Sequence, residues 1–139
     1  MTTIQCRDTA DGAAHLVDSR MVLSVALTDS RLPRVLRFIE ENLKNPNLGI
    51  GMLQSAFHVS RPTLHRMFRA AGGASRYIRE RRLLVAHQYI HNNPDSSITF
   101  LLYDLGFASD RQFQRAFHAY FGMSAAQWRQ CCRPRRIGH

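Results

Sequence analysis

Two arginine-rich stretches of the chain carry side chains that could read or bind a nucleic acid. The first begins at Ser60 and the second at Ser109, and both follow the pattern Ser-x-x-x-Φ-x-Arg-x-Phe, where Φ is apolar. The copies lie 49 residues apart, and Leu53 corresponds to Leu102 at the same offset. Arginine offers a forked set of donors that suits phosphates and guanine edges, and glutamine suits adenine. The repeat therefore indicates a duplicated unit that binds nucleic acid.

In each copy, two apolar residues four positions apart are expected to face the protein core. These pairs are Leu64 with Phe68 and Phe113 with Phe117, because residues i and i+4 lie on one face of a helix. A serine at each helix start also leaves backbone amides free for a phosphate. The alternative, a pair of ordinary amphipathic helices with solvated arginines, is disfavoured by the repeat. The candidate phosphate contacts are Ser60, Arg61, Thr63, Arg69, Ser109 and His118.

The positive charge of the chain is unevenly distributed. The 139 residues include 19 Lys+Arg against 10 Asp+Glu, which gives a net charge of +9. Residues 1–30 hold two arginines and four aspartates, so they carry −2 and the remainder carries +11. A basic domain attracts polyanions in general, so the charge alone leaves DNA, RNA and an acidic membrane surface as candidate partners.

The residues around the two copies predict helices and no strands. Each copy consists of a short helix, a tight turn and a longer helix that starts at a serine, which is the helix-turn-helix layout. Gln112 and Gln127 stand three residues after a serine, where they could complete capping boxes. We expect an all-α fold of about seven helices, with starts near Arg31, Ile50, Ser60, Ser75, Ser97, Ser109 and Ser124.

Three details of these helices are also predicted from spacing and from turn residues. The helix that starts at Ser60 should continue to Ala71, where Gly72-Gly73 would end it. Ala56 should face inward, and Tyr89 should lie on the apolar side of the helix at 75–92.

Other classes of function find little support in the residues. The three cysteines and seven histidines show no metal-ligand spacing, and no nucleophile–base pair or phosphate loop occurs. We therefore expect no catalysis, no metal, no cofactor and no evident small-molecule site. The longest apolar stretch is too short for a bilayer, and the N-terminus lacks the order of a signal peptide. We expect a cytoplasmic, nucleoid-associated protein that does not bind membranes.

Taken together, these motifs resemble the DNA-binding domain of the AraC/XylS transcription regulators over residues 31–130. The most specific stretch is Gly106–Phe117, which reads GFASDRQFQRAF and is followed by FGMS at Phe121–Ser124 and by Trp128-Arg129. The segment from Tyr77 through Arg82 to Ile90 resembles the linker helix of the family. Ser60–Phe68 resembles its first recognition helix.

The resemblance implies a sequence-specific transcription regulator, and specifically an activator. It implies two subdomains at about 31–73 and 96–130, joined by a linker helix at about 75–92. The recognition helices at about 60–71 and 109–121 would enter successive major grooves of double-stranded DNA, and RNA polymerase is a further implied partner. Carried over by position, the base-reading candidates are Pro62, His65, Arg66, Asp110, Arg111, Gln114 and Arg115.

Arg66 and Arg115 are the favoured base readers, and the alternative for both is a phosphate contact or an intrahelical ion pair. The first unit departs most from the family pattern, since His58 replaces the usual turn glycine. Gln54 and Leu102 stand where a small alanine is usual, so they could push the crossing helices apart. The second unit is therefore expected to be the firmer reader.

The remaining segments leave several alternatives open. Residues 1–30 are expected to be an N-terminal extension or the remnant of a regulatory domain, and residues 131–139 a basic tail. Leu84 and Val85 are expected at a partner surface. A DNA-binding module without regulatory output and a helical protein–protein adaptor remain alternatives to the regulator, and the oligomeric state stays open.

Overall fold

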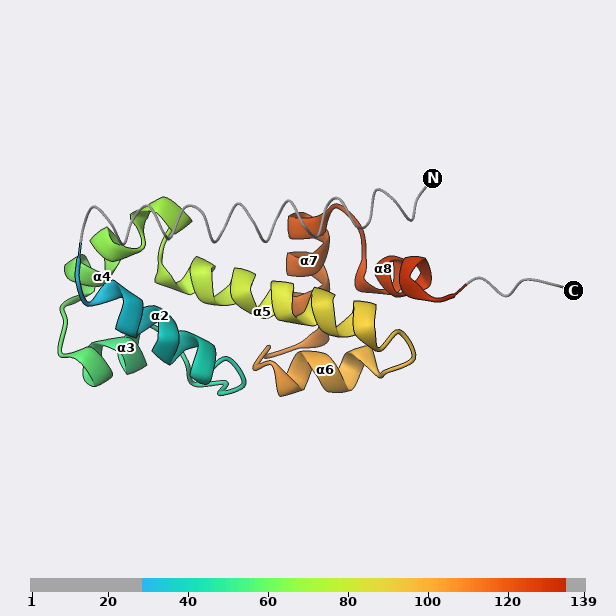
Figure 1. The fold of residues 1–139 in the computed structure, drawn as a ribbon, viewed down its shortest axis with the longest axis horizontal. Coiled ribbons are helices and arrows are strands. Elements are labelled where there is room, and N and C mark those ends of the chain that lie inside the picture. The colour runs from blue at the N-terminus through green and yellow to red at the C-terminus, as the bar shows by residue number, and fades with distance from the viewer. Residues whose placement is uncertain (1–28, 135–139) are drawn as a thin grey trace, which may run out of the picture.

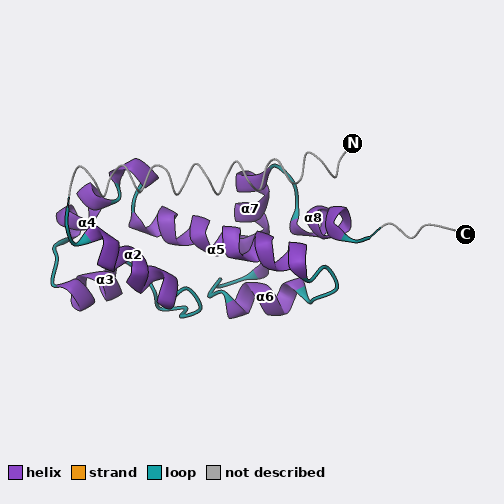
Figure 2. Cartoon of the chain, viewed as in Figure 1, coloured by secondary structure: helices purple, strands orange, loops and turns teal. Residues whose placement is uncertain are grey.

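The computed structural model describes residues 29–134, and every regular element within them is a helix (Figure 1). No strand occurs in this range (Figure 2), which confirms the predicted all-α fold. Most of the expected extension at 1–30 and of the tail at 131–139 lies outside the described residues. The α-helices are α2 (Leu32–Glu41), α3 (Ile50–Phe57), α4 (Arg61–Met67), α5 (Ala74–Asn92), α6 (Ile98–Asp104), α7 (Asp110–Phe121) and α8 (Ala125–Cys132), and the 3-10 helix η1 (Arg69–Ala71) follows α4.

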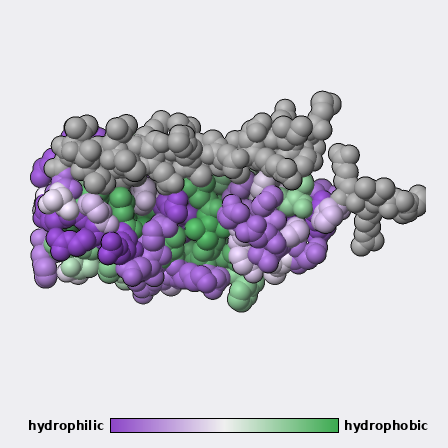
Figure 3. All heavy atoms as spheres, viewed as in Figure 1, coloured by the Kyte–Doolittle hydropathy of each residue, from purple (hydrophilic) through white to green (hydrophobic). Residues whose placement is uncertain are grey.

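Two hydrophobic cores lie along α5, one at each end. Tyr77 and Ile78 at the start of α5 pack into the first core, with apolar residues of α2, α3 and α4. The second half of α5 packs into the other core with α6, α7 and α8, and Val85 contacts both cores. Hydrophilic residues cover most of the coloured part of the face in Figure 3, and a hydrophobic band shows near its middle, over α5. The long helix therefore joins two separately packed units.

The predicted apolar pairs of the repeat are confirmed as core residues. Leu64 and Phe68 are buried in the first core, and Phe113 and Phe117 in the second, each at most 1% exposed. Leu102 is also fully buried in the second core. Burying such side chains contributes about 1.5–3 kcal/mol each, so the residues that define the repeat also stabilise the fold.

Serine side chains begin most of the helices, as the sequence predicts. Their hydroxyl oxygens accept a hydrogen bond from the backbone N–H three residues later, at Ser60, Ser97, Ser109 and Ser124. The capping box of Ser124 and Gln127 is complete. At the other predicted box, the Gln112 side chain accepts instead from the N–H of Ala108, at 3.1 Å. The first orphan amides of these helices are therefore satisfied locally.

Two predicted helix boundaries are wrong. Ser75 does not cap α5, because the helix already begins at Ala74 after Gly73, whose φ of 113° ends the preceding turn. The helix that starts at Ser60 does not continue to Ala71. It tightens at Phe68, whose N–H bonds to the carbonyls of Leu64 and Arg66, and η1 follows.

Three predicted orientations are also wrong. Ala56 is exposed, because Phe57 turns inward instead and meets Phe38 edge-to-face with ring centroids 5.4 Å apart. Tyr89 is 43% exposed and packs into neither hydrophobic core. Leu84, expected at a partner surface, is buried in the second core because α6, α7 and α8 wrap around this end of α5.

A buried guanidinium, that of Arg82, connects the two units. Arg82 of α5 is 8% exposed and donates from Nε to the carbonyl of Leu43 at 2.9 Å and from Nη2 to that of Asn45 at 2.7 Å. A Cβ at Gly106, in the turn of the second unit, would lie 2.8 Å from Nη2 of Arg82. The loop after α2, the linker helix and the second turn therefore meet at this side chain.

Candidate nucleic-acid interface

The first recognition helix, α4, exposes a short basic surface. Pro62, His65 and Arg66 are exposed, and Thr63 is half-buried. The guanidinium of Arg66 donates to the hydroxyl of Thr63 at 3.2 Å, and that hydroxyl lies 2.8 Å from the oxygen of Ser60. Thr63 is thus engaged within the helix start. An open groove of about 510 Å³ is lined by Arg61, Pro62, His65, Arg66 and Arg69.

The turn between α3 and α4 places this helix by an unusual backbone conformation. His58 has φ 52° and ψ 45°, the left-handed region that favours glycine. Gly106 occupies the corresponding turn of the second unit with φ 84°. The first unit therefore makes its turn through a non-glycine residue in the left-handed region, at a cost in backbone strain.

The second recognition helix, α7, is longer than α4 and is amphipathic. Phe113 and Phe117 face the core, while Arg111, Arg115 and His118 are exposed on the outer faces. Gln114 is half-buried and donates to the carboxylate of Asp110 at 3.3 Å. These two candidates therefore contact each other across one helical turn in the free protein.

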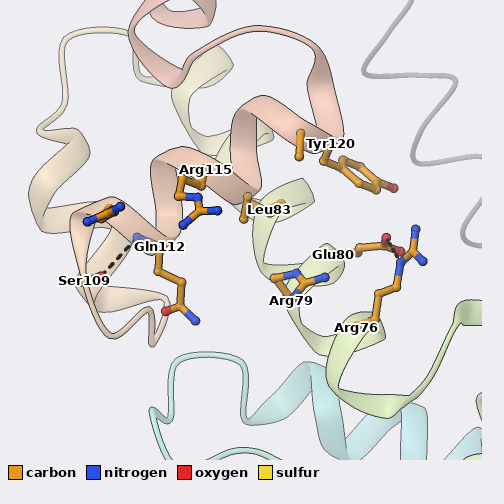
Figure 4. Close-up of a pocket in the computed structure, with 11 residues that line it drawn as sticks. Arg76, Arg79, Glu80, Leu83, Ser109, Gln112, Arg115 and Tyr120 are labelled. Atoms are coloured by element: carbon orange, nitrogen blue, oxygen red, sulfur yellow. Dashed lines mark hydrogen bonds and ion pairs between the residues drawn. The ribbon is translucent and has the colours of Figure 1, made fainter.

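A cleft of about 590 Å³ lies between α5 and α7, the second recognition helix (Figure 4). Arg111 and Arg115 of α7 line it, and so do Arg76 and Arg79 of α5. Sequence reasoning missed Arg76 and Arg79. The available signal was a pair of arginines three residues apart on the linker helix, but only the crossing of α7 over α5 turns them into part of the same surface.

The electrostatics of the cleft are strongly one-sided. Among the described residues that line it, the one carboxylate is that of Glu80, which is 9% exposed and accepts a hydrogen bond from Nε of Arg76 at 3.0 Å. Within residues 29–134, Arg79, Arg111 and Arg115 form no hydrogen bond or ion pair. Three guanidinium groups thus face this space with no carboxylate partner among residues 29–134, which is an arrangement suited to a polyanion.

The structure brings the sequence-predicted residues to two separate helices. Six lie on α4 or at its start, six lie on α7 or at its start, and Arg69 lies beyond the end of α4. Arg69 is displaced from α4 to η1 because the α-helix ends early. In the described range, 29–134, no group of three or more His, Cys, Asp or Glu side chains could hold a metal ion. No helix among these residues combines the length and hydrophobicity that a bilayer crossing requires.

Two helix-turn-helix units, each with an exposed basic second helix, define a DNA-binding domain. Comparison with known families agrees, since the model of a family described as a helix-turn-helix domain matches residues 53–130. This match covers more than half of the chain, and the protein belongs to the AraC-type helix-turn-helix family. The matched residues form a DNA-binding domain of that type, and this kind of domain is not an enzyme class.

Two curated relatives place the domain in larger proteins. The chain is 31% identical over 100 residues to the transcriptional activator NphR of a Rhodococcus species, which covers 71% of the chain and 30% of that protein. It is 25% identical over 118 residues to histidine kinase P4 of Formosa agariphila, which covers 84% of the chain and 8% of that protein. The chain thus spans less than a third of each of these relatives. No solved structure matches it.

Proposed function

We propose that this protein is a sequence-specific transcription activator that places α4 and α7 in successive major grooves of one DNA duplex. The observation that carries the proposal is the presence of two recognition helices, α4 and α7, joined by a linker helix of suitable length. With 19 residues, α5 is about 28 Å long at about 1.5 Å per residue. Successive major-groove segments on one face of B-DNA are about 34 Å apart. Because α4 packs at the start of this helix and α7 along its second half, a linker of this length supports engagement of neighbouring grooves.

The proposed division of roles follows the exposure of each side chain. Arg66 and Arg115 read bases, because both are exposed and arginine is bidentate to guanine. Pro62, His65 and Arg111 are further base contacts, and Asp110 and Gln114 contribute once their mutual contact opens. The phosphate contacts are Ser60, Arg61, Thr63, Arg69, Ser109 and His118.

Activation is proposed from the relationship to the Rhodococcus protein, whose name describes an activator. Contact with RNA polymerase and action at the nucleoid are proposed as what activation at a bound promoter would involve. Whether the protein activates or represses is tested by placing a DNA sequence that it binds upstream of a reporter gene. Transcription of the reporter is then measured with and without the protein. A fall in transcription would refute activation and leave DNA binding intact.

DNA recognition is tested by selecting bound sequences from a random duplex pool. Two half-sites about one helical turn apart are expected, and a single half-site would refute simultaneous engagement of both helices. The purified operator is then compared with random DNA for Arg115→Ala and Arg115→Lys. Lysine keeps the charge but loses the bidentate fork.

We expect Arg115→Lys to lose operator preference while it retains most affinity for random DNA, and Arg115→Ala to lose both. Discrimination should fall by about 1–3 kcal/mol, the range for one bidentate base contact. An equal loss on both DNAs for the lysine variant would refute base reading by Arg115 and leave it as a phosphate contact. The same pair of variants at Arg66 tests the first unit.

A further inference from the structure

We propose that the linker helix is itself part of the DNA interface. The cleft between α5 and α7 binds a phosphodiester group of the DNA strand that passes between α4 and α7. Arg79 is the main contact and Arg76 the second. This inference rests on the proposed function, because it assigns a further contact to the same bound duplex.

The geometry brings two helices to one open cleft. Figure 4 shows Arg79 on α5 and Arg115 on α7 lying on facing sides of the cleft, with Gln112 and Ser109 along the α7 wall. The cleft therefore borders the side chains proposed to read bases. A duplex seated on α7 would bring its backbone past this opening.

The positive charge of the cleft favours an anionic ligand. Glu80 is neutralised by Arg76, so the lining retains the positive charges of Arg79, Arg111 and Arg115. Like charges gathered in one space repel each other, and an anion relieves that repulsion. Guanidinium groups bind phosphate oxygens by paired, charge-assisted hydrogen bonds. A phosphodiester matches both the charge and the donor geometry.

Arg76 is held in place before any ligand arrives. Its Nε is bonded to Glu80, and a Cβ at Gly72 would lie 2.9 Å from its Cδ. Gly72 thus leaves room for this side chain at the end of η1. Arg79 has no such restraint and is free to reach a phosphate from the middle of the helix face.

The test uses the full chain, with Arg79→Ala and Arg79→Lys as variants and Lys44→Ala as the charge-matched control. Lys44 lies in the loop after α2 and is paired with Asp104, away from the cleft. Affinity is measured by fluorescence anisotropy on the selected operator and on random duplex over a range of salt concentrations. Circular dichroism confirms that each variant is folded.

We expect Arg79→Ala to weaken binding to both duplexes by the same factor, about three- to tenfold. The slope of log affinity against log salt should become shallower by about 0.9, the contribution of one phosphate contact. Arg79→Lys should keep the slope, and Lys44→Ala should match the wild type.

An unchanged slope for Arg79→Ala would overturn the inference, and so would a loss confined to the operator. A second arm titrates inorganic phosphate into the free protein and follows its melting temperature. Stabilisation that depends on Arg79, together with an unchanged DNA slope, would assign the cleft to free phosphate and also overturn the inference. If the wild type itself shows no salt-dependent duplex binding, the proposed function fails first.

Discussion

Replacing Arg82 by methionine should destabilise the whole domain, because this side chain joins the two units from within. Methionine keeps most of the apolar stem and removes the guanidinium. The carbonyls of Leu43 and Asn45, now bonded at 2.9 and 2.7 Å, then lose their donor. Burial lowers the pKa of Arg82, which shows that desolvating the charge has a cost.

The size of the effect follows from these opposing terms. Hydrogen bonds from a charged donor contribute about 1.5–3 kcal/mol each, so two of them contribute about 3–6 kcal/mol. Methionine carries no charge that must be desolvated, which offsets part of this loss. We therefore expect the free energy of unfolding to fall by about 3 kcal/mol. For a domain of roughly 100 residues, this lowers Tm by at least about 10 °C.

The assay is urea unfolding followed by circular dichroism, with Arg79→Met as the matched control on the same helix. Arg79 is exposed and bonds to no other group between residues 29 and 134, so its variant should differ from the wild type by less than about 0.5 kcal/mol. Equal losses for the two variants would refute the reasoning. So would a loss below about 0.5 kcal/mol for Arg82→Met.

Three further predictions concern stability. His58→Gly should raise the free energy of unfolding by about 0.5–1 kcal/mol, since glycine adopts the left-handed turn without strain; a loss in urea unfolding would contradict this. Ser109→Ala should lower the free energy of unfolding by about 1 kcal/mol, because Ser109 caps α7, and Ser109→Asp should keep the wild-type stability. An alanine variant as stable as the wild type would show that the cap contributes nothing. Burial, with a smaller contribution from His91, lowers the pKa of His87 to about 4, so stability should be full above pH ~6.5 and fall by about 3 kcal/mol as pH drops to ~4. His87→Gln should flatten that loss, and an unchanged pH profile for this variant would refute it.

Local chemistry explains which features the sequence predicts well. The cap of Ser109 involves the N–H of a residue three positions away, and the pair Phe113 and Phe117 is one helical turn apart. Such features need no knowledge of the fold. The wrong prediction at Ser75 is also local, because glycine and serine compete to start the same helix and Gly73 prevails.

The residues that sequence reasoning missed depend on distant segments. Arg82 bonds to carbonyls 39 and 37 positions earlier in the chain, and no periodic pattern connects such positions. Arg76 and Arg79 resemble ordinary solvated arginines until α7 crosses beside them. Leu84 likewise appears as a surplus apolar residue until three helices surround it. Tertiary packing decides the role of each.

The asymmetry between the two readers has a physical basis in the lengths of their helices and in their neighbours. The first reader has seven residues and follows a turn made by a strained histidine. The second has twelve, follows a glycine turn and stands beside the arginines of α5. If the proposed phosphate contacts form, a longer helix flanked by them is held more firmly in its groove, and firm placement is what base reading requires. Substitutions at Arg115 should therefore reduce operator preference more than the same substitutions at Arg66, and equal losses would show that the two units read DNA alike.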